Sequence, residues 1–427
     1  MIKKEIFKEI ITQFHTEPLR DIRNRDITIH INSGKIVTVS GVRRSGKTFI
    51  LYDTIKRLIN KGININNVLY INFEDERLEL SHQELDLILQ AYLELYPDLN
   101  LSECYFFFDE IQNIDGWDKF VRRLYDSVTR NIFITGSNSR LLSREIATSL
   151  RGRTVTYEVY PLSFHEYLRF HNVEINVYKP SLRAKTSSMF ERYLFEGGFP
   201  ELIFIHKGLK QKVLQEYLDV MLFRDLIERY KIANVSVLKY FMKRIFNNLT
   251  KPFSVNKIYN ELKSQGYKIG KNLLYNLLDA MVSIYLCIPL TKYTTSIVKE
   301  ELSEKKVYIV DNGLVGAVNF SLSKDYGKLL ENTVFLHLYR KYKKIFFYKE
   351  KTECDYVFLD EKGKFHAVQV SYSLSDAETK KRETEGLVSA CKRLDIRRGI
   401  IITMAEEYEF TADGIDITVL PAYKFLI

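Results

Sequence analysis

The chain has 427 residues, of which 46% are hydrophobic and 27% charged, and its formal net charge is +9. This length is too great for one hydrophobic core, so we expect two to four domains. The basic charge permits a polyanionic partner but does not demand one. The four cysteines lie far apart with no C-x-x-C pair, which disfavours a disulfide framework and a zinc site.

The sequence contains no segment typical of membrane insertion. Its first ten residues, MIKKEIFKEI, resemble an amphipathic helix with charges throughout and not a signal peptide. The longest apolar stretch, from Ala280 to Leu290, is too short to span a bilayer. We therefore expect a cytoplasmic protein.

The strongest motif lies at residues 41–48. A short apolar run at residues 36–39 ends at Gly41, and the residues from there to Thr48 match G-x-x-x-x-G-K-[ST]. A helical pattern follows. A strand before and a helix after this motif are the context of a phosphate-binding loop. The alternative is a glycine-rich turn before an ordinary helix.

Each part of this loop has an expected role. The glycines at positions 41 and 46 let the backbone turn so that its amides point at phosphate oxygens. Lys47 is expected to reach the β- and γ-phosphates, and the hydroxyl of Thr48 is expected to hold Mg²⁺. The expected cofactors are therefore ATP and Mg²⁺. The residues expected to bind the nucleotide are Gly41, Val42, Arg43, Arg44, Ser45, Gly46, Lys47, Thr48 and Phe49.

Predicted strands alternate with helices through the first 160 residues. The strands cover residues 36–39, 68–73, 104–108, 132–135 and 154–160. This alternation predicts an α/β fold, a P-loop NTPase core with a parallel five-stranded sheet and helices on both faces. Ligands bind beyond the carboxyl ends of such strands, so Lys47, Asp109 and Ser137 are expected to converge.

Two acidic residues follow the predicted strand at residues 104–108. Asp109 is expected to hold Mg²⁺ through water, and Glu110 is expected to polarise the attacking water. The alternative is a solvated acidic turn. Ser137 and Asn138, after the next strand, are candidates to hydrogen-bond the γ-phosphate or the water, and the alternative for them is a helix cap.

The remaining chain divides by pattern and composition, and with the core at residues 1–160 this gives four predicted domains. Residues 161–235 are helical in pattern and are expected to form a lid. Residues 236–310 contain helix, turn, helix and hairpin, which is the order of a winged helix. Residues 311–427 have the pattern of a further α/β domain, with strands near residues 345–348, 356–359, 366–370, 399–403 and 417–420.

The winged-helix segment is rich in basic residues. Residues 236–292 contain nine basic and two acidic residues. The candidates for contact with DNA phosphates are Lys257, Lys268, Lys271 and Lys292. The alternatives are an ordinary solvated face and a module that binds protein.

Segments along nearly the whole chain are typical of one family. They are GVRRSGKT, FFFDEIQN, ITGSNSRLLSREI, SLRGRTVTYEVYPLSFHEYL, EGGFPE, FRDLIERY, KVYIVDNGL, ECDYVF and AVQVSY. They resemble the AAA+-type ATPases widespread in archaea and bacteria, which carry a C-terminal domain of unknown function resembling PD-(D/E)XK nucleases. The resemblance makes Arg151 and Arg153 candidates for a charge-stabilising arginine, acting in cis or from a neighbouring subunit of a homo-oligomer. The alternative is that they pair with nearby acids.

The resemblance also implies a nuclease-like site in the C-terminal domain. An active site of this type would hold Mg²⁺ with Glu331, with Asp355 and with an E-x-K pair. Glu353 and Asp355 supply acids, but the E-x-K position reads Gln369-Val370-Ser371 and lacks the lysine. Lys380 or Lys381 could replace it from the following helix. We therefore expect a nuclease-like fold that cleaves DNA poorly or not at all.

The predicted function is an ATP-binding and ATP-hydrolysing switch that is coupled to DNA binding through the winged helix. One alternative is a scaffold in which ATP controls protein contacts without nucleic acid. The other is a DNA-cleaving nuclease, if the altered C-terminal motif is active.

Overall fold

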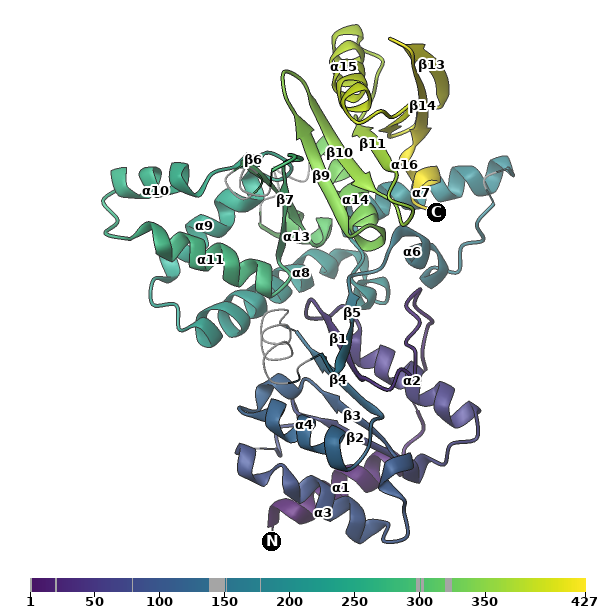
Figure 1. Cartoon of the computed structure of the whole chain (residues 1–427), viewed down its shortest axis with the longest axis vertical. Coiled ribbons are helices and arrows are strands. Elements are labelled where there is room, and N and C mark those ends of the chain that lie inside the picture. The colour runs from purple at the N-terminus through teal and green to yellow at the C-terminus, as the bar shows by residue number, and fades with distance from the viewer. Residues whose placement is uncertain are drawn as a thin grey trace. The chain divides into compact units, whose positions relative to one another are not determined.

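The structure is a computed structural model, and it describes residues 2–427 except 20, 79, 138–149, 151, 177, 297–299, 301–302 and 319–324. The chain divides into two compact units (Figure 1). The first comprises Met1–Tyr160 with Ser283–Tyr285, and the second comprises Pro161–Val282 with Leu286–Ile427. The segments predicted as lid, winged helix and C-terminal domain thus belong almost entirely to the second unit.

The first unit is built around a parallel sheet. Its strands are β1 (Ile36–Gly41), β2 (Val68–Asn72), β3 (Tyr105–Asp109), β4 (Ile132–Gly136) and β5 (Thr154–Val159). They are ordered β2-β3-β4-β1-β5, and every neighbouring pair is parallel. This confirms the predicted α/β fold with a five-stranded parallel sheet. Ser40 on β1 pairs with Gly136 on β4, so the carboxyl ends of these two strands lie side by side.

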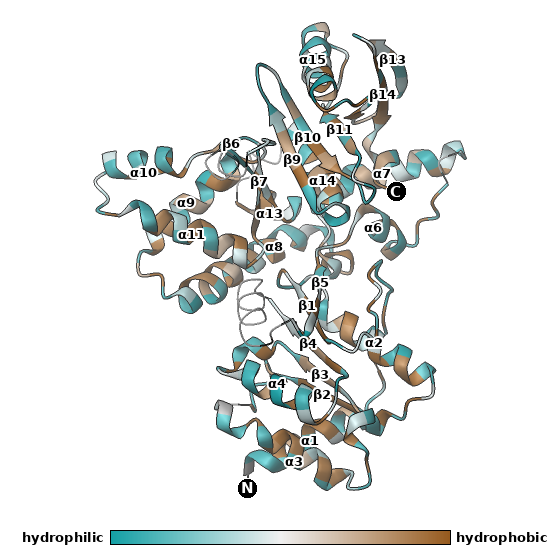
Figure 2. Ribbon diagram, viewed as in Figure 1, coloured by the Kyte–Doolittle hydropathy of each residue, from teal (hydrophilic) through white to brown (hydrophobic). Residues whose placement is uncertain are grey.

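Helices cover both faces of this sheet. They are α1 (Ile2–Thr16), α2 (Lys47–Asn60), α3 (Asp86–Leu95) and α4 (Trp117–Ser127). Successive strand residues point to opposite faces, so each face has its own core. Phe106 and Phe108 pack with α1, α3 and α4, whereas Val37 and Phe107 pack on the other face with α2. The strands β2 and β3 are accordingly hydrophobic along their length (Figure 2), as expected for a parallel sheet buried on both faces.

The second unit begins with helices. They are α6 (Phe164–Phe170), α7 (Pro180–Glu196), α8 (Lys210–Val220) and α9 (Val235–Asn247), and α8 continues as a π-helix over Met221–Glu228. A capping box starts α6, because Ser163 and Glu166 each bond the other's backbone N–H. Gly197, with a φ of 76°, ends α7 in the breaker cluster expected from the sequence.

Two further helices follow the first strand of a small antiparallel sheet and precede its other two strands. The helices are α10 (Val255–Ser264) and α11 (Lys271–Ser283), and the strands are β6 (Pro252–Phe253), β7 (Cys287–Thr291) and β8 (Lys305–Ile309). The strand order is β6-β8-β7. The side chain of Ser254 caps α10 by accepting from Lys257 N at 3.3 Å.

The chain ends in a mixed sheet of order β13-β14-β12-β11-β10-β9. Its strands are β9 (Lys344–Lys349), β10 (Glu353–Leu359), β11 (Phe365–Val370), β12 (Arg398–Thr403), β13 (Tyr408–Ala412) and β14 (Ile415–Pro421). The helices of this region are α13 (Asn312–Val318), α14 (Tyr326–Lys341), α15 (Ala377–Arg393) and α16 (Ala422–Phe425). The five predicted strands are present. The sequence did not predict β13, because this short edge strand has no fully buried residue. No helix among the described residues is long and apolar enough to cross a membrane.

Candidate functional site

The phosphate-binding loop joins the end of β1 to the start of α2. Gly41 has no room for a side chain, because a Cβ there would lie 2.0 Å from the backbone oxygen of Val159. Gly46 has a φ of 93°, which a residue with a side chain rarely adopts, and Arg44 is also left-handed with a φ of 65°. The loop therefore has the tight, partly left-handed backbone that turns amides toward an anion.

Lys47 opens α2 and is only 4% exposed. Its Nζ lies 3.2 Å from Oε1 of Glu110 and donates to the backbone oxygen of Val42 at 3.4 Å. The ammonium therefore lies between the phosphate-binding loop, where it contacts Val42, and the end of β3, where it contacts Glu110. The expectation that Lys47 would meet the residues at the end of that strand agrees with this geometry.

Asp109 ends β3 and is almost fully buried. Its Oδ2 accepts from the hydroxyl of Tyr70 at 3.0 Å, and its Oδ1 accepts from the hydroxyl of Thr135. The hydroxyl of Thr48 is a further partner. Burial, and next the nearby Glu110, raise the pKa of Asp109, while these hydroxyl donors oppose the rise. Three hydroxyls thus hold a single carboxylate at the carboxyl edge of the sheet.

Glu110 turns the chain out of β3 with a φ of 52°. Its backbone N–H donates to Thr135 Oγ1 at 2.8 Å, and its Oε2 accepts from Gln112 Nε2 at 2.5 Å. Burial opposes ionisation, but Lys47 and Gln112 outweigh it and hold the pKa of Glu110 below its ordinary value. Glu110 is therefore an ionised carboxylate at neutral pH, which is the form that accepts a proton.

Two buried hydroxyls of the loop region have no hydrogen-bond partner within the described part of the chain. They are the Oγ atoms of Ser45 and Ser137. Ser137 follows Gly136, which is the partner of Ser40, so it lies beside the start of the phosphate-binding loop. Unsatisfied buried hydroxyls are uncommon in proteins, and a ligand with acceptor oxygens would satisfy them. Asn138, predicted to share this role, lies outside the described residues.

Of the two candidate arginines, only Arg153 can be placed, because Arg151 lies outside the described residues. The backbone oxygen of Arg153 accepts from Ile36 N, the first residue of β1. Arg153 thus lies at the amino end of the sheet, opposite the phosphate-binding loop, and its Nε bonds Asp126 at 3.0 Å. The predicted role in cis is therefore wrong for Arg153, and pairing with a nearby acid is what the structure contains. A role on a neighbouring subunit stays a prediction.

Several contributors to this site were not predicted from the sequence. Tyr70 and Thr135 hold Asp109, and Gln112 holds Glu110. Arg25, in contrast, belongs to a basic lead-in at residues 1–35 that the sequence predicts to pack beside the nucleotide, and it donates to the backbone oxygens of Ser45 and Tyr160, both at 2.8 Å. Tyr70 and Thr135 lie inside strands, where the sequence pattern does not separate them from ordinary core residues.

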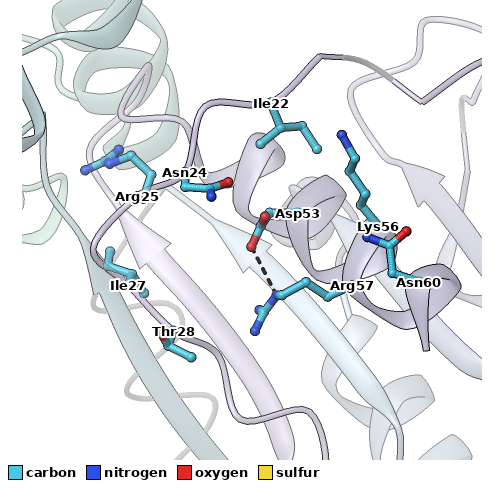
Figure 3. A pocket seen from close by; sticks show the side chains of 9 residues that line it. All are labelled: Ile22, Asn24, Arg25, Ile27, Thr28, Asp53, Lys56, Arg57 and Asn60. Carbon is cyan, nitrogen blue, oxygen red and sulfur yellow. Dashed lines mark ion pairs between the residues drawn. The ribbon is translucent and has the colours of Figure 1, made fainter. Parts of the chain in front are cut away.

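A polar cavity of about 420 Å³ adjoins α2 in the first unit. Figure 3 shows the segment before β1, with Asn24 and Arg25, on one side and the α2 residues Asp53 and Arg57 on the other. Asp53 and Arg57 form an ion pair at 3.1 Å. Because Arg25 also contacts Ser45, the cavity adjoins the phosphate-binding loop. Its lining is completed by Ile22, Ile27, Thr28, Lys56 and Asn60.

A second cluster of ionisable groups lies in the C-terminal region. Lys306 Nζ is 3.2 Å from Oε1 of Glu331, 2.7 Å from Oε1 of Glu353 and 3.0 Å from Oδ1 of Asp355. The structure thus brings together the three acids predicted for a nuclease-like site, and it adds a lysine that the sequence did not predict. Among the described residues, no group of three or more His, Cys, Asp or Glu is arranged to hold a metal ion.

The other residues predicted for this site have different partners. Gln369 Oε1 accepts from the backbone N–H of Asp355 at 3.0 Å, and Ser371 Oγ donates to the backbone oxygen of Ser373 at 2.9 Å. Lys380 Nζ lies over the rings of Tyr408 and Phe410 at 4.9 and 4.8 Å. The side chain of Lys381 is exposed, and its Nζ lies 3.9 Å from Oε1 of Glu385. The suggestion that Lys380 or Lys381 replaces the missing lysine is therefore wrong, because neither side chain turns toward the acids.

The lysines predicted to contact DNA fall into two groups. Lys257 on α10, Lys268 in the turn and Lys271 at the start of α11 are all exposed. Lys271 Nζ lies 5.4 Å from the ring of Tyr259. Lys292, in contrast, is only partly exposed, and its backbone is bridged to Phe347 of β9. It is therefore held against the C-terminal sheet.

Three family models match parts of the chain, and the second and third overlap. An "AAA domain" matches residues 33–168, a "Domain of unknown function (DUF8612)" matches residues 187–344, and a "Domain of unknown function (DUF4143)" matches residues 326–423. The last match shows that residues 326–423 form a domain shared with other proteins, but it does not show the nuclease-like domain predicted from the sequence. Among solved structures, the Orc1 protein of Aeropyrum pernix in complex with DNA aligns with 76% of this chain and 92% of its own, at 12% identity and a TM-score of 0.28. A TM-score this low supports no conclusion.

Two sequence relatives are much more similar. An uncharacterized protein of Methanocaldococcus jannaschii is 38% identical over 440 residues, covering 99% of this chain and 95% of the relative. An uncharacterized protein of Haemophilus influenzae is 33% identical, covering 72% of this chain and 74% of the relative. The chain therefore belongs to the same family as these archaeal and bacterial proteins, a P-loop ATPase family with an AAA domain near its N-terminus.

Proposed function

We propose that this protein binds ATP with Mg²⁺ at the phosphate-binding loop and hydrolyses it. The observation that carries this proposal is the meeting of the loop with the end of β3, where Lys47 faces Glu110 and Thr48 contacts Asp109. A cation for phosphate, two oxygen groups for a metal and an ionised base are the parts that nucleotide hydrolysis requires.

The residues present fit a magnesium ion. The hydroxyl of Thr48 and the carboxylate of Asp109 are hard oxygen donors that already contact each other, and Tyr70 and Thr135 orient the carboxylate. When bound there, Mg²⁺ would neutralise charge on the phosphate oxygens. It would also favour the ionised form of Asp109, whose pKa is otherwise raised.

Lys47 and Glu110 would act in sequence. The phosphate oxygens of ATP compete with Glu110 for the ammonium of Lys47, because both are anions within its reach. When Lys47 bonds phosphate, the Oε atoms of Glu110 lose their closest cation, and the carboxylate becomes a stronger base. It can then accept a proton from the attacking water. Ser137 Oγ, which has no partner among the described residues, is available to donate to the γ-phosphate.

The polar cavity beside α2 fits the nucleoside end of ATP. An α-helix rises about 1.5 Å per residue, so Asp53 lies roughly 9 Å along the axis from Lys47. We propose that a nucleotide with its phosphates at Lys47 extends along α2 into the cavity in Figure 3. Asn24 and Asn60 offer amide groups there for a base or a ribose.

We further propose that ATP binding is coupled to DNA binding through α10 and α11, which with the β7–β8 hairpin would form a winged helix. In support, the exposed residues of α11 include Lys271, Asn272, Tyr275 and Asn276, which suit contacts with phosphates and base edges. The alternative is a scaffold that contacts protein only.

ATP turnover, with DNA binding measured alongside it, tests both parts of the proposal. ATP turnover of the full chain is measured with Mg²⁺ alone, with duplex DNA and with single-stranded DNA. We expect ATP turnover to require Mg²⁺, and we expect its rate to change when DNA is added. The absence of turnover under every condition would contradict the ATPase proposal. Turnover that DNA leaves unchanged, with no DNA binding, would favour the scaffold.

A further inference from the structure

We infer that Lys306 is a built-in cation that closes the acidic site formed by Glu331, Glu353 and Asp355, so that this site takes no divalent metal while the lysine is in place. The inference concerns the C-terminal region alone and does not depend on the proposed ATPase activity. In this interpretation the three acids form a site whose occupant is the ammonium of Lys306 and not a metal ion.

The geometry is that of an ammonium site. The carboxylate oxygens of Glu331, Glu353 and Asp355 surround Lys306 Nζ at 2.7 to 3.2 Å, which is the range of charge-assisted hydrogen bonds. Lys306 is only 2% exposed. A divalent ion would need the same oxygens at about 2.0–2.6 Å and would occupy the position of the ammonium. Lys306 and a metal therefore exclude each other.

Two ammonium groups offset most of the acidic charge without a metal. Lys306 contacts all three acids, and Nζ of Lys349 lies 3.7 Å from Oε2 of Glu353. Burial opposes the charge of Lys306, but Glu331, Asp355 and Glu353 outweigh it and raise the pKa of Lys306 well above its ordinary value. The chain thus supplies two positive charges to three acids, which leaves little charge to attract a divalent cation.

The strand β8 holds Lys306 in this position. Two residues along β8, Tyr308 donates its hydroxyl to Oε1 of Glu331 at 3.0 Å. The Tyr308 ring stacks on Phe335 of α14 with a centroid distance of 3.9 Å. Val370 N fixes the other oxygen of Asp355 at 3.0 Å. Because β8 and the acids are fastened to each other independently of the lysine, the carboxylates should stay together when the ammonium is removed.

The test is Mn²⁺ binding to the full chain without nucleotide, followed by electron paramagnetic resonance of the unbound ion. All proteins carry Asp109→Asn, which removes the metal-binding carboxylate of the phosphate-binding loop. We expect no Asp355-dependent Mn²⁺ site in this parent protein. Lys306→Met approximately keeps the length of the side chain and removes its charge. This variant should gain a single saturable Mn²⁺ site. That site should disappear in Lys306→Met/Asp355→Asn, and the control Lys344→Met, an exposed lysine of β9, should gain none.

Two outcomes would overturn the inference. The first is a Mn²⁺ site in the parent protein that Asp355→Asn abolishes, because Lys306 would then not exclude the metal. The second is a folded Lys306→Met protein that binds no Mn²⁺. If Lys306→Met is unstable, its melting temperature is measured against Mn²⁺ concentration. Mn²⁺ should raise that temperature in Lys306→Met and not in the parent, and an equal response in both would also overturn the inference.

Discussion

The ammonium of Lys47 and the carboxylate of Glu110 lie 3.2 Å apart, although one opens the helix after β1 and the other follows β3. This pair joins the group expected to bind phosphate to the group expected to activate water. Removing Lys47 should therefore affect nucleotide binding, whereas removing Glu110 should affect hydrolysis.

Glu110→Gln should keep ATP binding and lose turnover. The amide can no longer accept a proton from water, and loss of a general base typically lowers the rate by about 10²–10⁴-fold. Lys47→Ala should instead abolish nucleotide binding, because the loop loses its cation. Binding is measured by calorimetry and turnover by phosphate release. Wild-type turnover by Glu110→Gln would show that Glu110 is not the base.

The pH dependence of activity should report the environment of Glu110. Lys47 and Gln112 hold its pKa below the ordinary value, so at saturating Mg²⁺, which keeps Asp109 ionised, kcat/KM should not fall with decreasing pH until the pH is below about 4.5. Gln112→Ala removes a donor to the ionised form, so the acidic limb of the profile should move to higher pH. Asn113→Ala, a change at the next residue, is the control. An unchanged limb in Gln112→Ala would contradict the assigned role.

Thr135→Val should destabilise the protein by about 1–3 kcal/mol, the usual cost of leaving a buried polar group unpaired. The hydroxyl of Thr135 serves both Asp109 Oδ1 and the backbone N–H of Glu110. Tyr70→Phe removes the bond to Asp109 and a longer one, at 3.3 Å, that Tyr70 accepts from the hydroxyl of Tyr52, and it should cost less. Urea unfolding measures both. A Tyr70→Phe protein that is less stable than Thr135→Val would contradict this ranking.

Thr28→Trp should weaken ATP binding by filling the cavity beside α2, which Thr28 lines. Tripolyphosphate has no nucleoside, so its binding at the loop should not change. Competition of each ligand with a fluorescent nucleotide separates the two effects. Equal weakening of ATP and tripolyphosphate would place the nucleoside elsewhere.

Replacing Lys268 and Lys271 with Glu should weaken DNA binding and reduce its dependence on salt. Each phosphate contact contributes about 0.9 to the slope of log affinity against log salt for duplex DNA, so losing two should lower the slope by roughly 2. Lys362→Glu, in an exposed turn, is the control. Binding is measured by fluorescence anisotropy over a salt series. Unchanged affinity and slope in the double variant would favour the protein-binding scaffold.

The features predicted correctly from the sequence are those that a contiguous segment encodes. The strand, glycine loop and helix around Lys47 form one unbroken motif, and Asp109 and Glu110 directly follow an apolar strand. Their types and positions need no knowledge of distant residues, because backbone geometry and hydrophobic pattern specify them locally. The alternation of strands and helices along the chain likewise predicts a parallel sheet.

Only the tertiary structure decided which residues meet across the sequence. Lys306 is separated by 25 positions from Glu331 and by 49 from Asp355, and no local pattern joins them. Arg153 belongs to a recognisable segment, yet strand register places it at the wrong end of the sheet to serve its own phosphate-binding loop. Strand order and register arise from burial of the whole apolar surface, which is a property of the folded chain and not of any single segment.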